Sequence, residues 1–173
     1  LSAAMKQMNA LDEKGLIAQD SIVQLLENKI VLIVPQNSTK DINKFEDILQ
    51  ADRIAIGDPE SVPAGQYAKE ALTNLNIWNK VLAKASLGTN VTEVLNWVAE
   101  GSADAGIVYS TDAASTAKVK VVAEAPEGSV SKVIYPVGII KTTKNEAAVK
   151  KFIEFLQTEE AKDVFKSFGF ATF

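Results

Sequence analysis

The stretch that decides the fold runs from Gly57 to Leu72 and reads GDPESVPAGQYAKEAL. It follows an apolar run, Arg53 to Ile56, which predicts a short buried strand. Residues Gln66 to Leu75 predict a helix, and the prolines and glycines in between predict a tight turn. A strand, a turn and a helix start leave backbone N–H groups free to bind an anion. An ordinary strand-to-helix connection has the same pattern, so both interpretations stay open at this stage.

The composition narrows the class of protein. Of the 173 residues, 47% are hydrophobic and 23% charged, as in globular domains, and the longest apolar runs are far shorter than the ~20 residues of a membrane span. The absence of cysteine and histidine excludes thiol nucleophiles, histidine bases, disulfides and Cys/His metal sites. Leu1 opens directly into a polar helical pattern, so no signal peptide is expected in this sequence.

The net charge of the chain indicates which classes of partner it can bind. A formal charge of −4 argues against nucleic acid as the main partner. Local dipoles, and not overall charge, would therefore hold an anionic ligand. Asp58 and Glu60 are a candidate acid–base pair, but Asp58-Pro59 is typical of a turn start, and no histidine, cysteine or metal cluster completes a catalytic constellation. We therefore expect no catalytic residue, no metal site and no enzymatic activity.

Hydrophobic patterning predicts alternating strands and helices. Predicted strands are Lys29–Val34, Ala105–Tyr109, Val119–Ala123 and Val133–Ile140, and predicted helices include Met5–Lys14, Phe45–Leu49, Asn145–Gln157 and Glu159–Phe168. Pro136 places the last strand at an edge or a bend. Residues 21–28 predict a short helical or irregular piece. The alternation predicts an α/β fold with mostly parallel sheets.

Helical spacing also predicts which side chains face the core. In the two C-terminal helices these are Val149, Phe152, Ile153, Leu156, Val164, Phe165 and Phe168. Met5 and Met8 are predicted to pack in the core, because a metal-binding methionine pair needs further ligands. Trp78 is predicted to pack on the core and so anchor a loop there; stacking against a ligand is the alternative. Asn90 and Glu93 have the spacing of a capping box at the start of another helix.

The Gly57–Leu72 stretch resembles the signature of the molybdate-binding proteins of bacterial ABC transporters. Three later segments resemble the same family in the same order: Thr89–Val94 (TNVTEV), Ala105–Ala113 (AGIVYSTDA) and Lys132–Val137 (KVIYPV). The resemblance implies a periplasmic-binding-protein-like architecture of two lobes, one complete and the other partial. Residues 33–134 would form the complete second lobe. Residues 1–32 and 135–173 would form the discontinuous remainder of the first, whose N-terminal part this chain lacks.

The resemblance also implies three ligand contacts in a cleft between the lobes. Ala64 would donate its backbone N–H from the Pro-Ala-Gly turn, Val91 its N–H from the next helix start, and Tyr109 its hydroxyl from a strand end. Such donors can hold a tetrahedral dianion without a counter-charge. Scaffold roles explain the same residues, since helix starts are far more common than anion sites.

The function implied by the resemblance is the substrate-binding component of a molybdate and tungstate ABC importer. The ligand would be molybdate or tungstate, with no cofactor, and the partner a membrane permease. We expect a location in the periplasm or on the extracellular face of the membrane, with a lipid anchor at an N-terminus outside this chain as one mode of attachment. A chain without that segment is expected either to self-associate through the exposed edge of the first lobe or to leave the remnant of that lobe poorly packed. The alternatives are a ligand-sensing domain of a transcription regulator with the same fold, and a receptor for another oxyanion.

Overall fold

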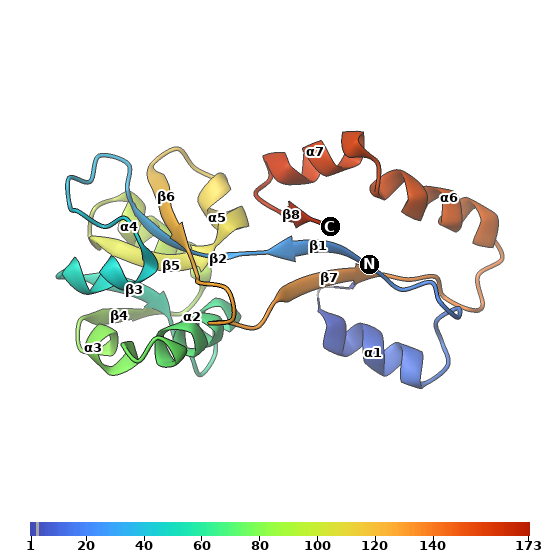
Figure 1. Ribbon diagram of the computed structural model, residues 1–173, viewed down its shortest axis with the longest axis horizontal. Helices are drawn as coiled ribbons and strands as arrows, with labels where there is room; N and C mark the ends of the chain where they lie inside the picture. Colours follow the sequence, from blue (N-terminus) through green and yellow to red (C-terminus); the bar gives the residue numbers. More distant parts are fainter. Residues whose placement is uncertain (3) are drawn as a thin grey trace. The chain divides into compact units, whose positions relative to one another are not determined.

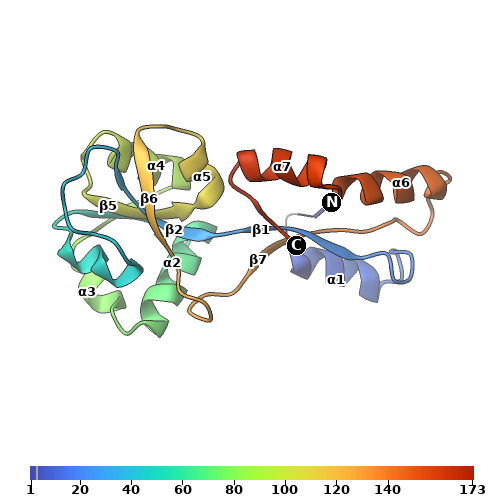
Figure 2. The ribbon, with the colours of Figure 1, turned by 45° about the horizontal axis from the view of Figure 1, so that its top comes forward.

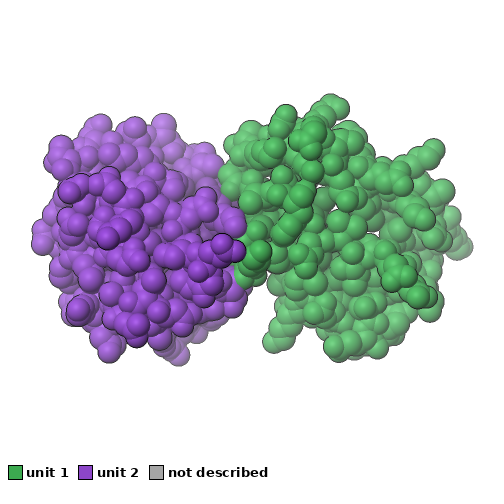
Figure 3. All heavy atoms as spheres, in the orientation of Figure 1, with its two compact units in different colours: residues 1–28, 132–173 green, residues 29–131 purple. Residues whose placement is uncertain are grey.

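The computed structural model describes residues 1–2 and 4–173 and divides the chain into two compact units (Figure 3). Unit 1 comprises Leu1–Asn28 and Lys132–Phe173, and unit 2 comprises Lys29–Ser131. The lobe boundaries expected at residues 33 and 134 fall inside strands β2 (Ile30–Pro35) and β7 (Val133–Val137). The chain therefore passes from one unit to the other just before each of these strands.

Unit 2 is built on a five-stranded sheet with the order β4-β3-β5-β2-β6. Besides β2, its strands are β3 (Ile54–Gly57), β4 (Ala85–Gly88), β5 (Ala105–Tyr109) and β6 (Val119–Glu124). Strand β3 pairs in parallel with β4 and β5, whereas β2 pairs antiparallel with β5 and β6. The expected parallel pairing thus holds for β3, β4 and β5, where helices connect the strands, and not for β2.

Helices cover both faces of this sheet (Figure 1). The 3-10 helix η1 (Phe45–Gln50), α2 (Pro63–Asn74) and α3 (Trp78–Leu82) pack on one face, and α4 (Val91–Ala99) and α5 (Ser110–Ala114) on the other. Alternate residues of β2 enter the two cores: Leu32 joins the first and Ile33 the second, both fully buried. This double coverage explains why β2 is apolar throughout instead of alternating.

Unit 1 contains a three-stranded antiparallel sheet of order β7-β1-β8. Its remaining elements are α1 (Met5–Glu13), β1 (Val23–Asn28), α6 (Glu146–Leu156), α7 (Glu159–Ser167) and β8 (Ala171–Thr172). Figures 1 and 2 agree that α1 lies on one side of β1 and β7, and that α6 and α7 lie on the other. The interpretation of residues 21–28 as helical or irregular is wrong, because β1 pairs along both edges. Strand β7 lies at the sheet edge, as Pro136 predicted.

The apolar faces of α6 and α7 are only partly covered. Ile153 is buried, and Phe165 packs against the same cluster. Phe152 and Phe168, however, are 57% and 65% exposed, and Val164 is 54% exposed, so the prediction that these three face the core is wrong. Helical spacing shows which residues share a face, but it does not show whether another layer covers that face.

Asp104 joins the starts of β3 and β5, at the end of the sheet opposite the helix starts of α2 and α4. Its carboxylate, in a side chain 13% exposed, accepts hydrogen bonds from the N–H groups of Asp52 (3.2 Å) and Arg53 (3.0 Å) and from the Arg53 guanidinium (2.9 Å). Burial raises the pKa of Asp104, but the hydrogen bonds and charge of Arg53 outweigh that effect and hold the pKa below its usual 3.8. The folded state therefore favours the ionised carboxylate.

Asp104→Asn is expected to destabilise unit 2 by on the order of 1 kcal/mol at neutral pH, because a charged acceptor is replaced by a neutral one beside a half-exposed arginine. A carboxyl group with a depressed pKa stabilises the fold above its unfolded pKa and loses this effect as the pH falls through the folded pKa. The difference between wild type and variant should therefore shrink below about pH 3.8. Urea unfolding followed by tryptophan fluorescence, at neutral pH and below about pH 3.8, measures this difference in stability. An equal difference at the two pH values would contradict the stabilising role of the ionised Asp104 carboxylate.

Candidate functional site

The start of α2 is pressed against the end of β3. A Cβ atom added to Gly65 would lie 2.1 Å from the carbonyl oxygen of Gly57, and one added to Gly57 would lie 2.7 Å from Val62 Cγ1. Only glycines allow this approach. Pro63 occupies the first helical position, where its fixed φ suits a helix start and its missing N–H costs nothing. The Pro-Ala-Gly sequence therefore places the first turn of α2 directly at the strand end.

At the starts of α2 and α4, the N–H groups of Ala64 and Val91 have no hydrogen-bond acceptor among the described residues. Ala64, only 1% exposed, is the second residue of α2, and Val91 is the first residue of α4. Within residues 1–2 and 4–173, neither N–H donates to a backbone or side-chain group. The first N–H groups of any helix have no intrahelical partner, and leaving them unpaired away from water costs free energy. Both can therefore bind an external acceptor.

The start of α4 is held by side chains. Asn90 caps the helix as predicted, because its Oδ1 accepts the N–H of Glu93 at 2.9 Å. The other half of the capping box differs from the prediction. The Glu93 carboxylate accepts the N–H of Thr89 (2.7 Å) and the Thr89 hydroxyl (3.0 Å), and not the N–H of Asn90. The carboxylate therefore fastens the residue before the cap.

Tyr109 is the last residue of β5 and is half-buried. Its ring packs edge-on against Tyr67 of α2, with ring centroids 6.3 Å apart, and its N–H donates to the Asp112 carboxylate at 3.2 Å. Burial raises the pKa of Asp112, and the hydrogen bond from Tyr109 only partly offsets that effect. Compared with the unfolded chain, the folded state holds the Asp112 proton more tightly, so the contribution of Asp112 to stability falls as the pH rises above about 3.8.

One pocket of about 280 Å³ brings the three predicted ligand contacts together. Ala64, Val91 and Tyr109 all line it, and all belong to unit 2. Its remaining lining residues are Ser61, Val62, Pro63, Thr89 and Asn90. The convergence follows from topology: β3, β4 and β5 are adjacent and parallel, so the segments that leave their carboxyl ends meet at one edge of the sheet.

The additional lining residues were not identified as contacts from the sequence. They nevertheless belong to the two quoted motifs: Ser61 precedes the Pro-Ala-Gly turn, and Thr89 and Asn90 precede Val91. Their proximity to the predicted donors was the available signal. The sequence contained no sign of which side chains on the turns would face the pocket.

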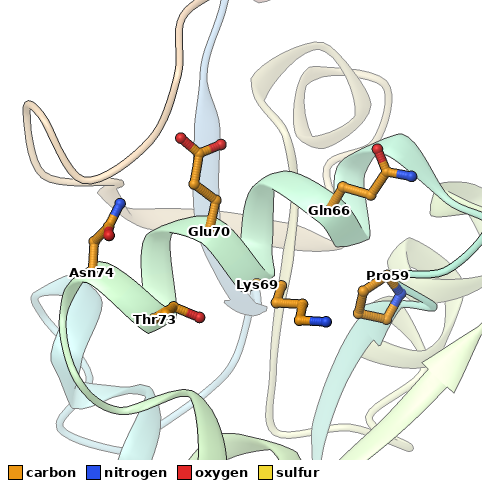
Figure 4. Close-up of a pocket in the computed structure, with 6 residues that line it drawn as sticks. All are labelled: Pro59, Gln66, Lys69, Glu70, Thr73 and Asn74. Carbon is orange, nitrogen blue, oxygen red and sulfur yellow. The ribbon is translucent and has the colours of Figure 1, made fainter.

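A second pocket, of about 400 Å³, lies along α2, where Figure 4 shows Lys69 and Glu70 next to each other and Asn74 one turn further along. Two of its polar side chains, Glu70 and Asn74, already have hydrogen-bond partners. The Glu70 carboxylate accepts the N–H (2.8 Å) and the hydroxyl (2.6 Å) of Ser131, and the Asn74 amide donates to the Ser129 carbonyl at 2.8 Å. These bonds fasten residues 129–131 to the helix. With a carboxylate among its walls, this pocket suits an oxyanion less well than the smaller one.

Other candidates from the sequence have structural contacts. Trp78 packs against the first core cluster of unit 2, with the Lys69 ammonium 5.8 Å from its ring centroid. The Asp58 carboxylate accepts the N–H of Glu60 at 3.0 Å, which is the predicted turn contact. Met8 is buried in unit 1. No group of three or more acidic residues suited to a metal ion occurs in the described part of the chain.

Comparison with known proteins identifies the class. The sequence profile of the bacterial extracellular solute-binding proteins matches residues 1–171, and the chain belongs to this family. Proteins of this family bind solutes outside the cell, in agreement with the resemblance found in the sequence. Across residues 1–2 and 4–173, no helix combines the length and apolar character that crossing a membrane requires.

Several relatives have more specific names. The chain is 44% identical over 169 residues to the lipoprotein YvgL of Bacillus subtilis, covering 98% of this chain and 65% of the relative. It is 42% identical over 176 residues to the molybdate-binding protein ModA of Haemophilus influenzae, covering 99% and 69%. The chain thus spans about two thirds of the length of these relatives.

Solved structures agree in fold. A substrate-binding domain assigned to a molybdenum ABC transporter of Clostridium difficile superposes with a TM-score of 0.94 at 42% identity, over 99% of this chain and 75% of that one. The periplasmic molybdate-binding protein of Azotobacter vinelandii superposes with a TM-score of 0.70 at 22% identity, over 98% and 76%. The second likeness shows the fold alone. Together they confirm the periplasmic-binding-protein-like α/β fold.

Proposed function

We propose that this chain is the substrate-binding component of a molybdate importer, and that Ala64, Val91 and Tyr109 contact the oxyanion. The observation that carries the proposal is that Ala64 and Val91, whose N–H groups donate to no group among the described residues, line one pocket together with Tyr109. The names of the relatives from Haemophilus influenzae and Clostridium difficile support molybdate as the ligand.

The proposed chemistry needs neither a metal nor a catalytic group, and the chain acts as a receptor and not as an enzyme. The N-terminal ends of α2 and α4 carry partial positive charge, and both are at the pocket. Charge-assisted hydrogen bonds from such N–H groups contribute about 1.5–3 kcal/mol each. Tungstate has the same tetrahedral shape and charge as molybdate, so the same donors would bind it. Tyr109, at the end of strand β5, would contribute its hydroxyl as a side-chain donor.

The proposal extends to a partner and a location. A receptor of this class delivers its ligand to a membrane permease of an ABC transporter. Its place is the periplasm or the outer face of the membrane, where a lipid anchor is one means of retention. The named lipoprotein relative from Bacillus subtilis supports this mode of attachment.

Calorimetric titration of molybdate, tungstate and sulfate into the chain tests the ligand, with sodium chloride at equal ionic strength as the control. Molybdate and tungstate are expected to bind and to compete for one site, with sulfate weaker than either. Preferential sulfate binding would select the alternative of a receptor for another oxyanion. No heat and no competition with any of the three would overturn the proposal.

We also propose that the chain self-associates through exposed phenylalanines in α6 and directly after α7. Phe152, Phe155 and Phe168 are 57%, 48% and 65% exposed, and exposed large apolar side chains favour association. Sedimentation velocity should show oligomers that increase with concentration, and a variant with serine at all three positions should be monomeric. Leu87→Ser, at a 43% exposed position of unit 2, is the matched control and should still associate. A wild-type chain that stays monomeric at high concentration would contradict this.

A further inference from the structure

Glu93 is bonded in a way that affects the pocket without lining it. One carboxylate oxygen, Oε2, accepts both the N–H of Thr89 at 2.7 Å and its hydroxyl at 3.0 Å. The Asn90 side chain completes the network: its amide donates to the Thr89 hydroxyl at 3.3 Å, and its carbonyl accepts the Glu93 N–H at 2.9 Å. Thr89, Asn90 and Val91 line the pocket, whereas Glu93 does not.

This network determines which donors remain for a ligand. In an ordinary capping box the glutamate would occupy the N–H of Asn90. Here it binds Thr89 instead, and within the described residues the N–H groups of Asn90 and Val91 donate to no protein group. The Thr89 hydroxyl, in contrast, is directed to the carboxylate. The turn therefore presents two adjacent backbone N–H groups, and a neighbouring hydroxyl that is already engaged.

We infer that Glu93 is a positioning residue for the oxyanion site: it fixes the Thr89–Asn90 turn so that the Val91 N–H stays oriented toward the ligand. The inference rests on the proposed function. A carboxylate this close to an anion site has two opposing effects. Its charge repels the anion, whereas its two hydrogen bonds hold the donor in place. Because the charge should weaken molybdate binding and the hydrogen bonds should strengthen it, variants that remove one or both can distinguish the two effects.

Two variants separate the effects. Glu93→Gln removes the charge but keeps an amide oxygen that can accept the same two hydrogen bonds. Glu93→Ala removes both. Glu100→Ala, at the exposed C-terminal end of the same helix, changes the net charge equally and serves as the control. Molybdate affinity is measured by calorimetry for all three, with urea unfolding in parallel so that a loss of stability is not mistaken for a loss of affinity.

The positioning role predicts that Glu93→Ala weakens molybdate binding by on the order of tenfold, the equivalent of one weak charge-assisted hydrogen bond. Glu93→Gln and Glu100→Ala should bind as wild type or more tightly. If alanine and glutamine at position 93 both tighten binding equally, Glu93 acts only through its charge and the inference is wrong. Unchanged affinity in both variants overturns it as well.

Amide hydrogen exchange without ligand gives a second readout, independent of the proposed function. The Thr89 N–H should exchange at least about tenfold faster in Glu93→Ala and should remain protected in Glu93→Gln, because only alanine removes the acceptor. If wild type binds no oxyanion while this exchange pattern holds, the proposed function fails and the geometry of the turn stands. If wild type binds molybdate but Thr89 exchange is the same in both variants, the positioning role fails alone.

Discussion

Replacing Val91 with proline is expected to weaken molybdate binding by about 10- to 150-fold. The substitution removes a single N–H donor from the pocket, and a charge-assisted hydrogen bond contributes about 1.5–3 kcal/mol. Calorimetric titration of the variant against wild type measures the loss.

The backbone at this position accepts proline. Val91 is the first residue of α4, the helical position that proline favours. Asn90 before it is extended, with φ −159° and ψ 165°, a conformation that proline allows in the preceding residue. Val91→Ala, which shortens the side chain but keeps the N–H, is the control and should bind within about threefold of wild type. If the proline variant binds as tightly as the alanine variant, the Val91 N–H does not contact the ligand.

The second large effect is expected from Gly65→Ala, which should destabilise unit 2 by about 3 kcal/mol or more and abolish oxyanion binding. The new methyl group would lie 2.1 Å from the Gly57 carbonyl oxygen and 3.0 Å from the backbone carbon of Asp58. These are main-chain atoms, so the start of α2 has to move away from β3, and overpacking of this kind is costly. The same movement displaces the Ala64 N–H from the pocket.

Tryptophan fluorescence during urea unfolding measures this effect in unit 2 alone, because both tryptophans, Trp78 and Trp97, belong to that unit. Gln66→Ala is the matched control one position further along the helix, at an exposed side chain, and should change stability by no more than about 0.5 kcal/mol. A Gly65→Ala variant as stable as this control would show that the close approach of α2 to β3 is not required.

The candidate site was predictable because its signals are local. The Pro-Ala-Gly turn, the Asn90 cap and the tyrosine at the end of an apolar strand each lie within a few residues of sequence, and each forms a helix start or strand end in unit 2. The prediction that these three features meet at one ligand site came from the family resemblance. In physical terms it depends on the parallel order of β3, β4 and β5, which short segments do not specify.

The errors arise where distant segments decide the outcome. Strand β1 was mistaken for a helical or irregular piece because its partners, β7 and β8, lie more than a hundred residues along the chain. Strands β4 and β8 are short, only four and two residues, and were not predicted. The exposure of Phe152 and Phe168 depends on whether another layer packs on their helices, which helical spacing does not show.

Glu93 illustrates a finer error of the same kind. The spacing of Asn90 and Glu93 predicted a reciprocal capping box, and the Asn90 half is present. The carboxylate reaches one residue further back, to Thr89, a difference that a spacing rule does not capture. Because of that difference, the N–H of Asn90 donates to no group among the described residues.

The most direct test of the central claim, that α2 and α4 hold an oxyanion through their first N–H groups, is a residue-resolved NMR titration with molybdate. The amide protons of Ala64 and Val91 should move downfield together and saturate at one concentration, while sodium chloride at equal ionic strength leaves them unchanged. The same response is expected from tungstate. Binding that shifts other amides and leaves those of Ala64 and Val91 in place would contradict the assignment of this pocket.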